Sequence, residues 1–337
     1  MNVLVTGGAG YIGSHAVRKL IDAGHRVVVC DDLSHGHHAA VDPRARFLDA
    51  DVGDCASVQA ALRENQIEAV LHFAAFIEVG ESVLQPARYY HNNTVNGLFL
   101  LDAMNAAGVR KLVFSSTAAV YGNPVRTPID EDHPRNPINP YGRSKFMTEL
   151  AIGDYSAAYG LGYAVLRYFN VAGAAPDGTL GEAHEPESHL IPRILSAAAG
   201  RGAGVSIFGT DYPTRDGTCV RDYVHVEDLV DAHLLALERI APGAGRAYNL
   251  GSERGFTVRE VIDACRRVTG RPIPVREGPR REGDPAELIA GSARARTELG
   301  WTPKYPDLDT IVGHAWNWHR THPKGYAEPA AAAAARD

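Results

Sequence analysis

The sequence predicts an α/β protein, with a doubly wound parallel sheet followed by a smaller C-terminal α/β domain. From the N-terminus to about position 170, short apolar runs alternate with helix-length amphipathic stretches, as repeated βαβ units do. The runs are continuously apolar, which is typical of strands covered by helices on both faces. We expect strands within residues 3–5, 27–30, 69–73, 112–114 and 163–167.

Beyond position 170 the pattern loosens. Residues 174–188 and 209–217 are rich in Gly, Pro and charge and are expected to be loops. Helices are expected over residues 224–238 and 258–269, and a short strand over 248–251. The alanine-rich segment 328–337 is expected to be a flexible tail.

The composition excludes several classes of protein. The 337 residues are 45% hydrophobic and 22% charged, which disfavours a disordered chain or a coiled coil. The 34 basic and 40 acidic residues give a net charge of 34 − 40 = −6, and without a basic cluster no nucleic-acid partner is expected. No apolar run approaches the length of a membrane-spanning helix and no signal peptide is evident, so we expect a cytoplasmic protein without a membrane partner.

The cysteines and histidines indicate no metal site. The four cysteines are widely spaced and form no CxxC pair, which argues against a disulfide framework or a zinc cluster. The histidines of residues 34–38 and the pair His314 and His319 lack metal-ligand spacing.

A glycine-rich turn follows the first expected strand and opens a helix. Its sequence is Thr6-Gly7-Gly8-Ala9-Gly10-Tyr11-Ile12-Gly13, with three of the glycines spaced as GxxGxxG. Glycine permits the tight turn and the close approach of backbone N–H groups to a pyrophosphate, and the helix N-terminus favours negative charge. The pattern predicts a Rossmann-type dinucleotide site to which Gly7, Gly10, Tyr11, Ile12 and Gly13 contribute.

Acidic residues follow the second and third expected strands. Asp31 ends the second strand, which is the first strand after the glycine turn. In a dinucleotide site, a carboxylate at this position accepts hydrogen bonds from the adenine ribose and repels a 2′-phosphate. NAD is therefore favoured over NADP, and Asp32 could share the role. Asp51 and Val52 follow the third strand, near the expected adenine. Phe73, Ala74 and Ala75 end the fourth strand, where small residues would let a cofactor lie across the strand tips.

A tyrosine and a lysine begin a helix after Pro140. Tyr141 and Lys145 are at positions i and i+4 and so share a helical face, and Ser115 and Thr117 stand at the tip of the strand before them. The chemistry expected here is abstraction of a proton from a sugar hydroxyl while its carbon gives up hydride. Lowering a tyrosine pKa from about 10 to about 7 takes roughly 4 kcal/mol, which Lys145 and an oxidised nicotinamide could supply. Thr117 could relay the proton.

With these motifs in view, the chain resembles the sugar-nucleotide 4-epimerases of the extended short-chain dehydrogenase/reductase family. The resemblance runs to about Tyr326 and includes motifs of the second half, among them Leu166-Arg167-Tyr168-Phe169-Asn170, Val220-Arg221-Asp222-Tyr223-Val224-His225 and Arg280-Arg281-Glu282-Gly283-Asp284. It implies a UDP-sugar substrate, with UDP-galactose and UDP-glucose interconverted through a transient 4-keto sugar and tightly bound NAD. It also implies an NAD-binding domain over residues 1–170 to which 224–251 return, and a substrate domain over 171–223 and 252–327.

The resemblance assigns residue roles. Tyr141 is implied to be the base and Lys145 to bind the nicotinamide ribose. Thr117 stands at a position where the family has Ser or Thr. Asn92, Ser115 and Tyr168 are implied to lie by the cofactor. Residues implied to contact substrate, besides Thr117 and Tyr141, are Asn170, His189, Leu190, Phe208, Arg221, Tyr223, Arg281, Asp284 and Leu288.

Three residues depart from the family pattern. Ile77 stands where many relatives carry Lys, which removes a cofactor contact. His189 replaces an Asn, and Leu288 occupies the position whose size controls acceptance of N-acetylated sugars.

Other functions are supported to different degrees by the same residues. A UDP-N-acetylglucosamine or UDP-pentose 4-epimerase remains open. A 4,6-dehydratase is disfavoured because Ala118 and Ala119 replace its acid/base pair, and an NAD-sensing interaction protein is disfavoured by the three catalytic-type residues together. Helices over about residues 86–107 and 140–159 correspond to a four-helix dimer interface in relatives, so a homodimer is expected.

Overall fold

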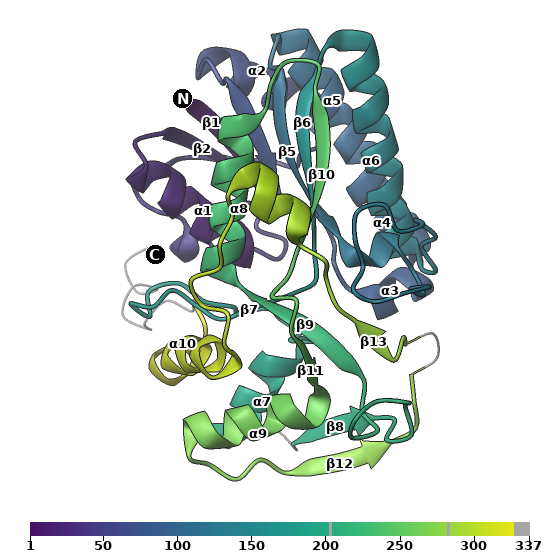
Figure 1. Cartoon of the computed structure of the whole chain (residues 1–337). Helices are drawn as coiled ribbons and strands as arrows, with labels where there is room; N and C mark the ends of the chain where they lie inside the picture. Colours follow the sequence, from purple (N-terminus) through teal and green to yellow (C-terminus); the bar gives the residue numbers. More distant parts are fainter. Residues whose placement is uncertain (202–203, 282–283, 327–337) are drawn as a thin grey trace, which may run out of the picture.

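A seven-stranded parallel sheet forms the larger part of the molecule (Figure 1). The computed structural model describes residues 1–201, 204–281 and 284–326, so the expected tail at 328–337 lies outside the described residues. The strands lie in the order β10-β6-β5-β4-β1-β2-β3, and every neighbouring pair is parallel. They are β1 (Asn2–Thr6), β2 (Arg26–Asp31), β3 (Arg46–Asp49), β4 (Ala69–His72), β5 (Lys111–Thr117), β6 (Gly162–Tyr168) and β10 (Gly245–Leu250).

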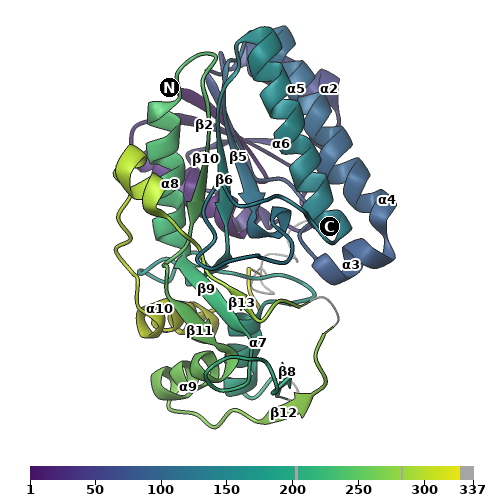
Figure 2. The same cartoon turned by 45° about the vertical axis from the view of Figure 1, so that its right-hand side comes forward.

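Helices cover both faces of this sheet (Figure 2). Val3 and Val5 of β1 pack in one apolar core with α1 (Tyr11–Asp22) and α8 (Val226–Arg239). Leu4, between them, points to the opposite core, which α2 (Cys55–Glu64), α5 (Asn96–Ala107) and α6 (Pro140–Tyr159) complete. Burial on both faces explains why the strands are continuous apolar runs. The predicted doubly wound α/β fold is confirmed.

The strand order reverses between β1 and β4. From β1 the chain runs outward to β3 and then returns to place β4 on the other side of β1. In such sheets the crevice beyond the carboxyl ends of the strands at this reversal is the usual ligand site. Gly7 follows β1 and Phe73 follows β4, so both lie at this point.

The segment expected to be one helix over about residues 86–107 contains an irregular turn. It comprises α4 (Pro86–Tyr89), a π-helical stretch (Tyr90–Val95) and α5, preceded by α3 (Val79–Leu84). Within the π-helical stretch Asn93 is buried, and its amide accepts from the Phe76 N–H (2.9 Å) and donates to the Phe76 carbonyl (3.0 Å). These bonds hold the loop after β4 against the helix.

The smaller part of the molecule is built from short elements around its own apolar core (Figure 1). Strand β9 (Val220–His225) pairs with β7 (Asn170–Ala172), β11 (Gly255–Thr257) and β13 (Glu287–Leu288), while β8 (Val205–Phe208) pairs with β12 (Val275–Gly278). Its helices are α7 (Leu190–Ala198), α9 (Val258–Thr269) and α10 (Leu308–Thr321). Short 3₁₀ or π turns occur at His38–Ala40, Ala118–Val120 and Ala295–Leu299.

Several boundaries differ from the sequence expectation by a few residues; for example, β4 ends at His72 and leaves Phe73 outside the strand. The helix predicted from residue 224 begins at Val226, because Val224 and His225 extend β9 and the His225 ring accepts a hydrogen bond from the Glu227 N–H (3.0 Å). The strand predicted over 248–251 is β10, which begins at Gly245. The helix over 258–269 is confirmed, with a capping box at Thr257 and Glu260. Among the described residues, no helix is both long and apolar enough to span a membrane.

Two helical glycines offer a test of the packing at the first turn. A Cβ at Gly13 in α1 would overlap the Gly7 carbonyl oxygen, whereas a Cβ at Gly313 in α10 would meet no atom within 4 Å. We expect Gly13→Ala to lower the free energy of unfolding by about 1–3 kcal/mol through overpacking. Gly313→Ala should raise it by up to about 1 kcal/mol, because alanine favours the helix. Denaturant unfolding of both variants measures this, and equal effects would contradict the assigned packing.

Candidate active site at the carboxyl edge of the sheet

The turn after β1 forms an open cradle of backbone atoms. Gly7 has a φ of +69°, and a Cβ there would lie 2.5 Å from the Ala74 nitrogen, so two backbones pass in direct contact. Gly10 is the N-cap of α1 and supplies no capping side chain. The N–H groups of the first helical turn, which includes Tyr11 and Ile12, are therefore available to an anion. These residues fit the pyrophosphate of a dinucleotide.

The side chains of that first turn face the protein. Tyr11 is buried and its hydroxyl donates to the Gly173 carbonyl (2.8 Å), which joins the turn to the end of β7. Ile12 packs against the core shared by α1 and α8. Both residues can thus meet a cofactor through their main chain.

Asp31 is held rigidly at the end of β2. It is 8% exposed, and its two carboxylate oxygens accept from the N–H groups of Ala9 and Leu33, both at 2.9 Å. Burial raises its pKa. Each oxygen keeps a further acceptor site, which fits a ribose hydroxyl. The neighbouring Asp32 is exposed and accepts from the Ser34 N–H.

The residues expected near the adenine and the strand tips also gather at this edge. Asp51 accepts from the Gly53 N–H (2.5 Å) and from the Asn96 amide (2.9 Å), and Val52 is buried. The Phe73 ring lies 4.8 Å from that of His233. Other expected cofactor residues close by are the half-buried Ala74, Ala75 and Asn92.

The tip of β5 meets the first turns of α6. This helix begins as expected, with Asn139 capping the Gly142 N–H (2.8 Å) and Pro140 in its first turn. Lys145 is buried and donates to the Ser115 carbonyl (3.1 Å). Thr117 pairs in register with Tyr168 on β6. The fold thus brings Thr117 together with Tyr141 and Lys145, although a long loop separates β5 from α6.

Burial shifts the pKa values of the tyrosine and the lysine in opposite directions. Burial raises the pKa of Tyr141 to about 12, although a hydrogen bond with Thr117 acts to lower it and Glu78 acts to raise it. Burial likewise lowers the pKa of Lys145 to about 7, with Glu149 opposing. The expectation that Lys145 and an oxidised nicotinamide together lower the Tyr141 pKa concerns the protein with its cofactor bound, and it stays a prediction. A buried site penalises both charged forms, so activation needs positive charge from a bound group.

The residues implied to contact substrate lie mainly on the small sheet. Asn170 of β7 pairs with Tyr223 of β9, and Arg221 of β9 pairs with Leu288 of β13. Arg221 is ion-paired with Asp284. From β8 and the segment beyond β12, Phe208 and Arg281 meet with the guanidinium 4.2 Å from the ring centre.

Two of these side chains also pack against hydrophobic residues of the protein. The Tyr223 ring is 5% exposed and packs in the apolar core of the smaller part. Leu288 lies with Phe146 and Phe169 beside a small cluster around Tyr121. The structure therefore places Tyr223 in the core, and its role toward substrate stays a prediction.

The segment at the start of α7 carries two residues that sequence reasoning expected, His189 and Leu190. The loop before it also brings in Glu182, Ser188 and Glu78, which the sequence did not indicate. His189 precedes α7, and its Nδ1 lies 2.5 Å from Glu182, while Leu190 packs in the smaller core. Glu182 raises the pKa of His189 to about 9 against the effect of burial. The Ser188 hydroxyl donates to Glu78 (2.7 Å), the carboxylate that acts on Tyr141. Glu78 and Ser188 thus link the loop to the catalytic-type residues, and Ile77 beside them is 38% exposed.

A buried ion pair joins α6 to the sheet. Arg167 of β6 donates to both carboxylate oxygens of Glu149 (2.7 and 3.0 Å), and the Ser116 hydroxyl of β5 donates to the same carboxylate (2.5 Å). Both charged side chains are no more than 4% exposed. Arg167 also donates to the Tyr121 hydroxyl (3.0 Å), which donates to Asn249 of β10 (2.7 Å). The pair therefore ties α6 to three strands of the sheet.

Comparisons with known proteins agree with this geometry. Residues 3–251 match the NAD dependent epimerase/dehydratase family. The chain is 52% identical to UDP-glucose 4-epimerase of Lacticaseibacillus casei over 329 residues, 97% of this chain and 99% of that one. It superposes on UDP-glucose 4-epimerase from Brucella ovis in complex with NAD with a TM-score of 0.90 and 48% identity, covering 94% and 97% of the two chains. The Bifidobacterium longum enzyme in complex with NAD+ and UDP gives 0.92 and 38%, covering 96% and 100%.

The buried ion pair can be tested by removing one partner or both. Glu149→Leu leaves the Arg167 guanidinium buried and unpaired, and we expect it to lower the free energy of unfolding by about 3–5 kcal/mol. The double variant Glu149→Leu/Arg167→Met should recover most of that loss. Arg267→Gln breaks a pair whose partners are more than half exposed and should cost less than about 1 kcal/mol. Denaturant unfolding distinguishes these cases, and a double variant no more stable than Glu149→Leu would argue against the pairing.

Proposed function

The chain belongs to the NAD dependent epimerase/dehydratase family, and we propose that it is a UDP-glucose 4-epimerase, an NAD-dependent isomerase that interconverts UDP-galactose and UDP-glucose. The observation that carries this proposal is the meeting of Thr117, Tyr141 and Lys145 at the carboxyl edge of the sheet, the same edge at which the glycine turn lies. Relatives with this name are about half identical to the chain, and the alignments cover nearly its full length.

NAD is the proposed cofactor, and it supplies a hydride acceptor and donor when bound. The turn of Gly7, Gly10 and Gly13 and the first N–H groups of α1 would hold its pyrophosphate, while Asp31 would accept from the adenine ribose. Lys145 is proposed to contact the nicotinamide ribose. Further proposed cofactor contacts are Asp32, Asp51, Val52, Phe73, Ala74, Ala75, Asn92, Ser115 and Tyr168.

Tyr141 is the proposed base that takes the proton of the C4 hydroxyl, with Thr117 as the relay. Starting from a pKa of about 12, a phenolate at pH 7 requires about 7 kcal/mol of electrostatic stabilisation. Lys145 contributes only while protonated, and Glu149, one turn further along α6, favours that form. The same tyrosine returns the proton to the C4 oxygen after the keto sugar has rotated. Because the hydride accepted by bound NAD would be given back to C4 as well, no net redox change would result.

The proposed substrate portion comprises residues 171–223 and 252–327, and the cofactor portion 1–170 and 224–251. Arg221 and Arg281 are proposed to hold the UDP diphosphate, with Phe208 by the uridine. Arg221 pairs with Asp284, so binding of a diphosphate requires Arg221 to turn or to share that contact. The other proposed substrate residues are Asn170, His189, Leu190, Tyr223 and Leu288.

The catalytic assignment is tested by Tyr141→Phe. We expect turnover of UDP-galactose to fall by about 10²- to 10⁴-fold, because the proton acceptor is lost while the ring still packs. Tyr163→Phe is the matched control, since the Tyr163 hydroxyl makes no hydrogen bond among the described residues, and its turnover should be unchanged. Products are resolved by chromatography after incubation without added NAD.

Two results would change the proposal. Unaltered epimerisation by Tyr141→Phe would remove Tyr141 from the mechanism. If the wild-type chain leaves UDP-galactose unconverted but converts UDP-N-acetylgalactosamine or UDP-arabinose, the substrate is that other sugar.

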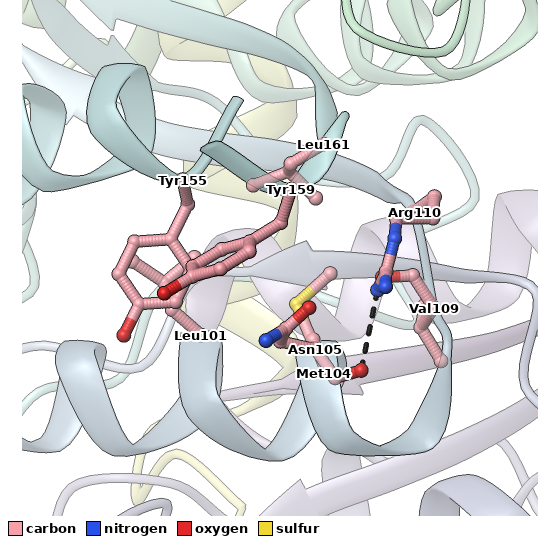
Figure 3. A pocket seen from close by; sticks show the side chains of 8 residues that line it. All are labelled: Leu101, Met104, Asn105, Val109, Arg110, Tyr155, Tyr159 and Leu161. Carbon is pink, nitrogen blue, oxygen red and sulfur yellow. Dashed lines mark hydrogen bonds between the residues drawn. The ribbon is translucent and has the colours of Figure 1, made fainter. Parts of the chain in front are cut away.

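We also propose a cytoplasmic homodimer. Phe99 of α5 and Met147 and Leu150 of α6 are large apolar side chains, 39–51% exposed, on two helices that lie side by side (Figure 2). A small pocket lies between these helices at the end away from Tyr141, lined by Leu101, Met104, Tyr155 and Tyr159 among others (Figure 3). Apolar exposure of this kind is typical of a protein interface. All four cysteines are free, as a reducing compartment favours.

Light scattering at micromolar concentration tests the dimer. We expect twice the 36.2 kDa chain mass for the wild type. Leu150→Glu should give the chain mass, because it places a charge within the apolar face. Val125→Glu, at a residue that is 73% exposed and belongs to neither helix, should stay dimeric. A wild-type monomer would refute the assembly.

A further inference from the structure

Four potential metal ligands converge in the loop between β7 and α7. Glu182, His184, Glu187 and His189 each offer one nitrogen or oxygen, and these four atoms lie within 4.8 Å of one another. They follow the spacing Glu-x-His-x-x-Glu-x-His. Of the four, only His189 was expected at a functional site from the sequence, as a substrate contact.

The separations within the cluster are close to those that a coordinated ion requires, but they differ from them by a few tenths of an ångström or more. The His184 Nδ1 lies 3.2 Å from Glu182 Oε1, which is 2.5 Å from His189 Nδ1. The two oxygens of Glu187 lie 3.8 Å from the two imidazole nitrogens, one each. For zinc bonds of about 2.0–2.1 Å, tetrahedral ligands are about 3.4 Å apart. The cluster therefore needs shifts of about an ångström or less along these contacts.

One ligand atom in the cluster makes no hydrogen bond within the described part of the chain, although it lies within ion-pairing distance of two carboxylates. The His184 Nδ1 is buried and makes no hydrogen bond of acceptable geometry among the described residues. It points into the group formed by the two carboxylates. A buried imidazole nitrogen without a hydrogen bond is unfavourable, and in the neutral ring that nitrogen can coordinate a metal ion.

We propose that Glu182, His184, Glu187 and His189 form a zinc-binding site. Two imidazoles and two carboxylates are a ligand set that Zn²⁺ accepts in four-coordinate sites. Because all four positions are filled by protein, the site is structural and leaves none open for a reacting water.

A divalent cation balances the two carboxylates without placing two imidazolium rings next to each other. Glu182 is 3% exposed on its side chain, so its carboxylate needs a positive partner. If both histidines were protonated, two imidazolium rings with centres 5.3 Å apart would repel each other. Zinc coordinates both rings in their neutral form and neutralises the two carboxylates.

The surroundings support the ligands and connect the site to the rest of the molecule. The Trp318 indole donates to the Glu182 carbonyl (3.2 Å), and the Tyr11 ring packs edge-on against His184 at 6.3 Å. Ser188, between two ligands, donates to Glu78 (2.7 Å). Zinc would thus fix the loop of residues 182–189 against the glycine turn and the start of helix α3. His189, the last of the four ligands, directly precedes α7.

Zinc content tests the site directly and does not depend on turnover. The full chain is dialysed against EDTA, exposed to ZnCl₂, desalted and measured by inductively coupled plasma mass spectrometry. We expect about one zinc per wild-type chain and a rise in the thermal midpoint upon loading. His184→Asn and Glu187→Gln should weaken zinc binding at least about tenfold, as measured by competition with a chelating dye.

Glu185→Gln is the matched control, because Glu185 lies between the ligands, is exposed and belongs to no ion pair in the described chain. It should bind zinc as the wild type does. If His184→Asn does not fold, Glu187→Gln decides the question, since Glu187 is only partly buried. The proposal is overturned if the wild type retains no stoichiometric zinc, or if a folded ligand variant retains as much as Glu185→Gln.

Discussion

The position of helix α6 depends on one buried ion pair. Glu149 and Arg167 are almost wholly removed from solvent, and a buried pair is tolerated only where geometry and hydrogen bonding are complete. The hydroxyls of Ser116 and Tyr121 complete it. Because Glu149 lies one helical turn after Lys145, the pair fixes the rotation of the helix and so the direction of Lys145 and Tyr141 toward the tip of β5.

The burial that positions these side chains also sets their chemistry. Removal from water raises the pKa of Tyr141 and lowers that of Lys145, so the chain alone favours two neutral groups. A positive charge bound next to the tyrosine would then have a large effect, because little solvent screens it. The proposed dependence on an oxidised cofactor follows from this low-dielectric setting.

The smaller part of the molecule brings together residues from short, separate segments. Strands β7, β9 and β13 supply Asn170, Arg221 and Leu288 from widely separated parts of the chain. The loop of Glu182 and His189 joins this group to Glu78 through Ser188. One side of the candidate site is therefore held by long-range contacts, whereas the glycine turn on the other side is local.

The sequence by itself determined the doubly wound fold, the glycine turn and the shared face of Tyr141 and Lys145, because apolar periodicity, glycine conformation and helical spacing act over a short stretch of chain. Only the tertiary structure decided the partners of Glu149, Arg221 and His189 and the direction of the Tyr141 pKa. Those properties arise from burial and from contacts between distant segments, and no local pattern encodes which segments will meet.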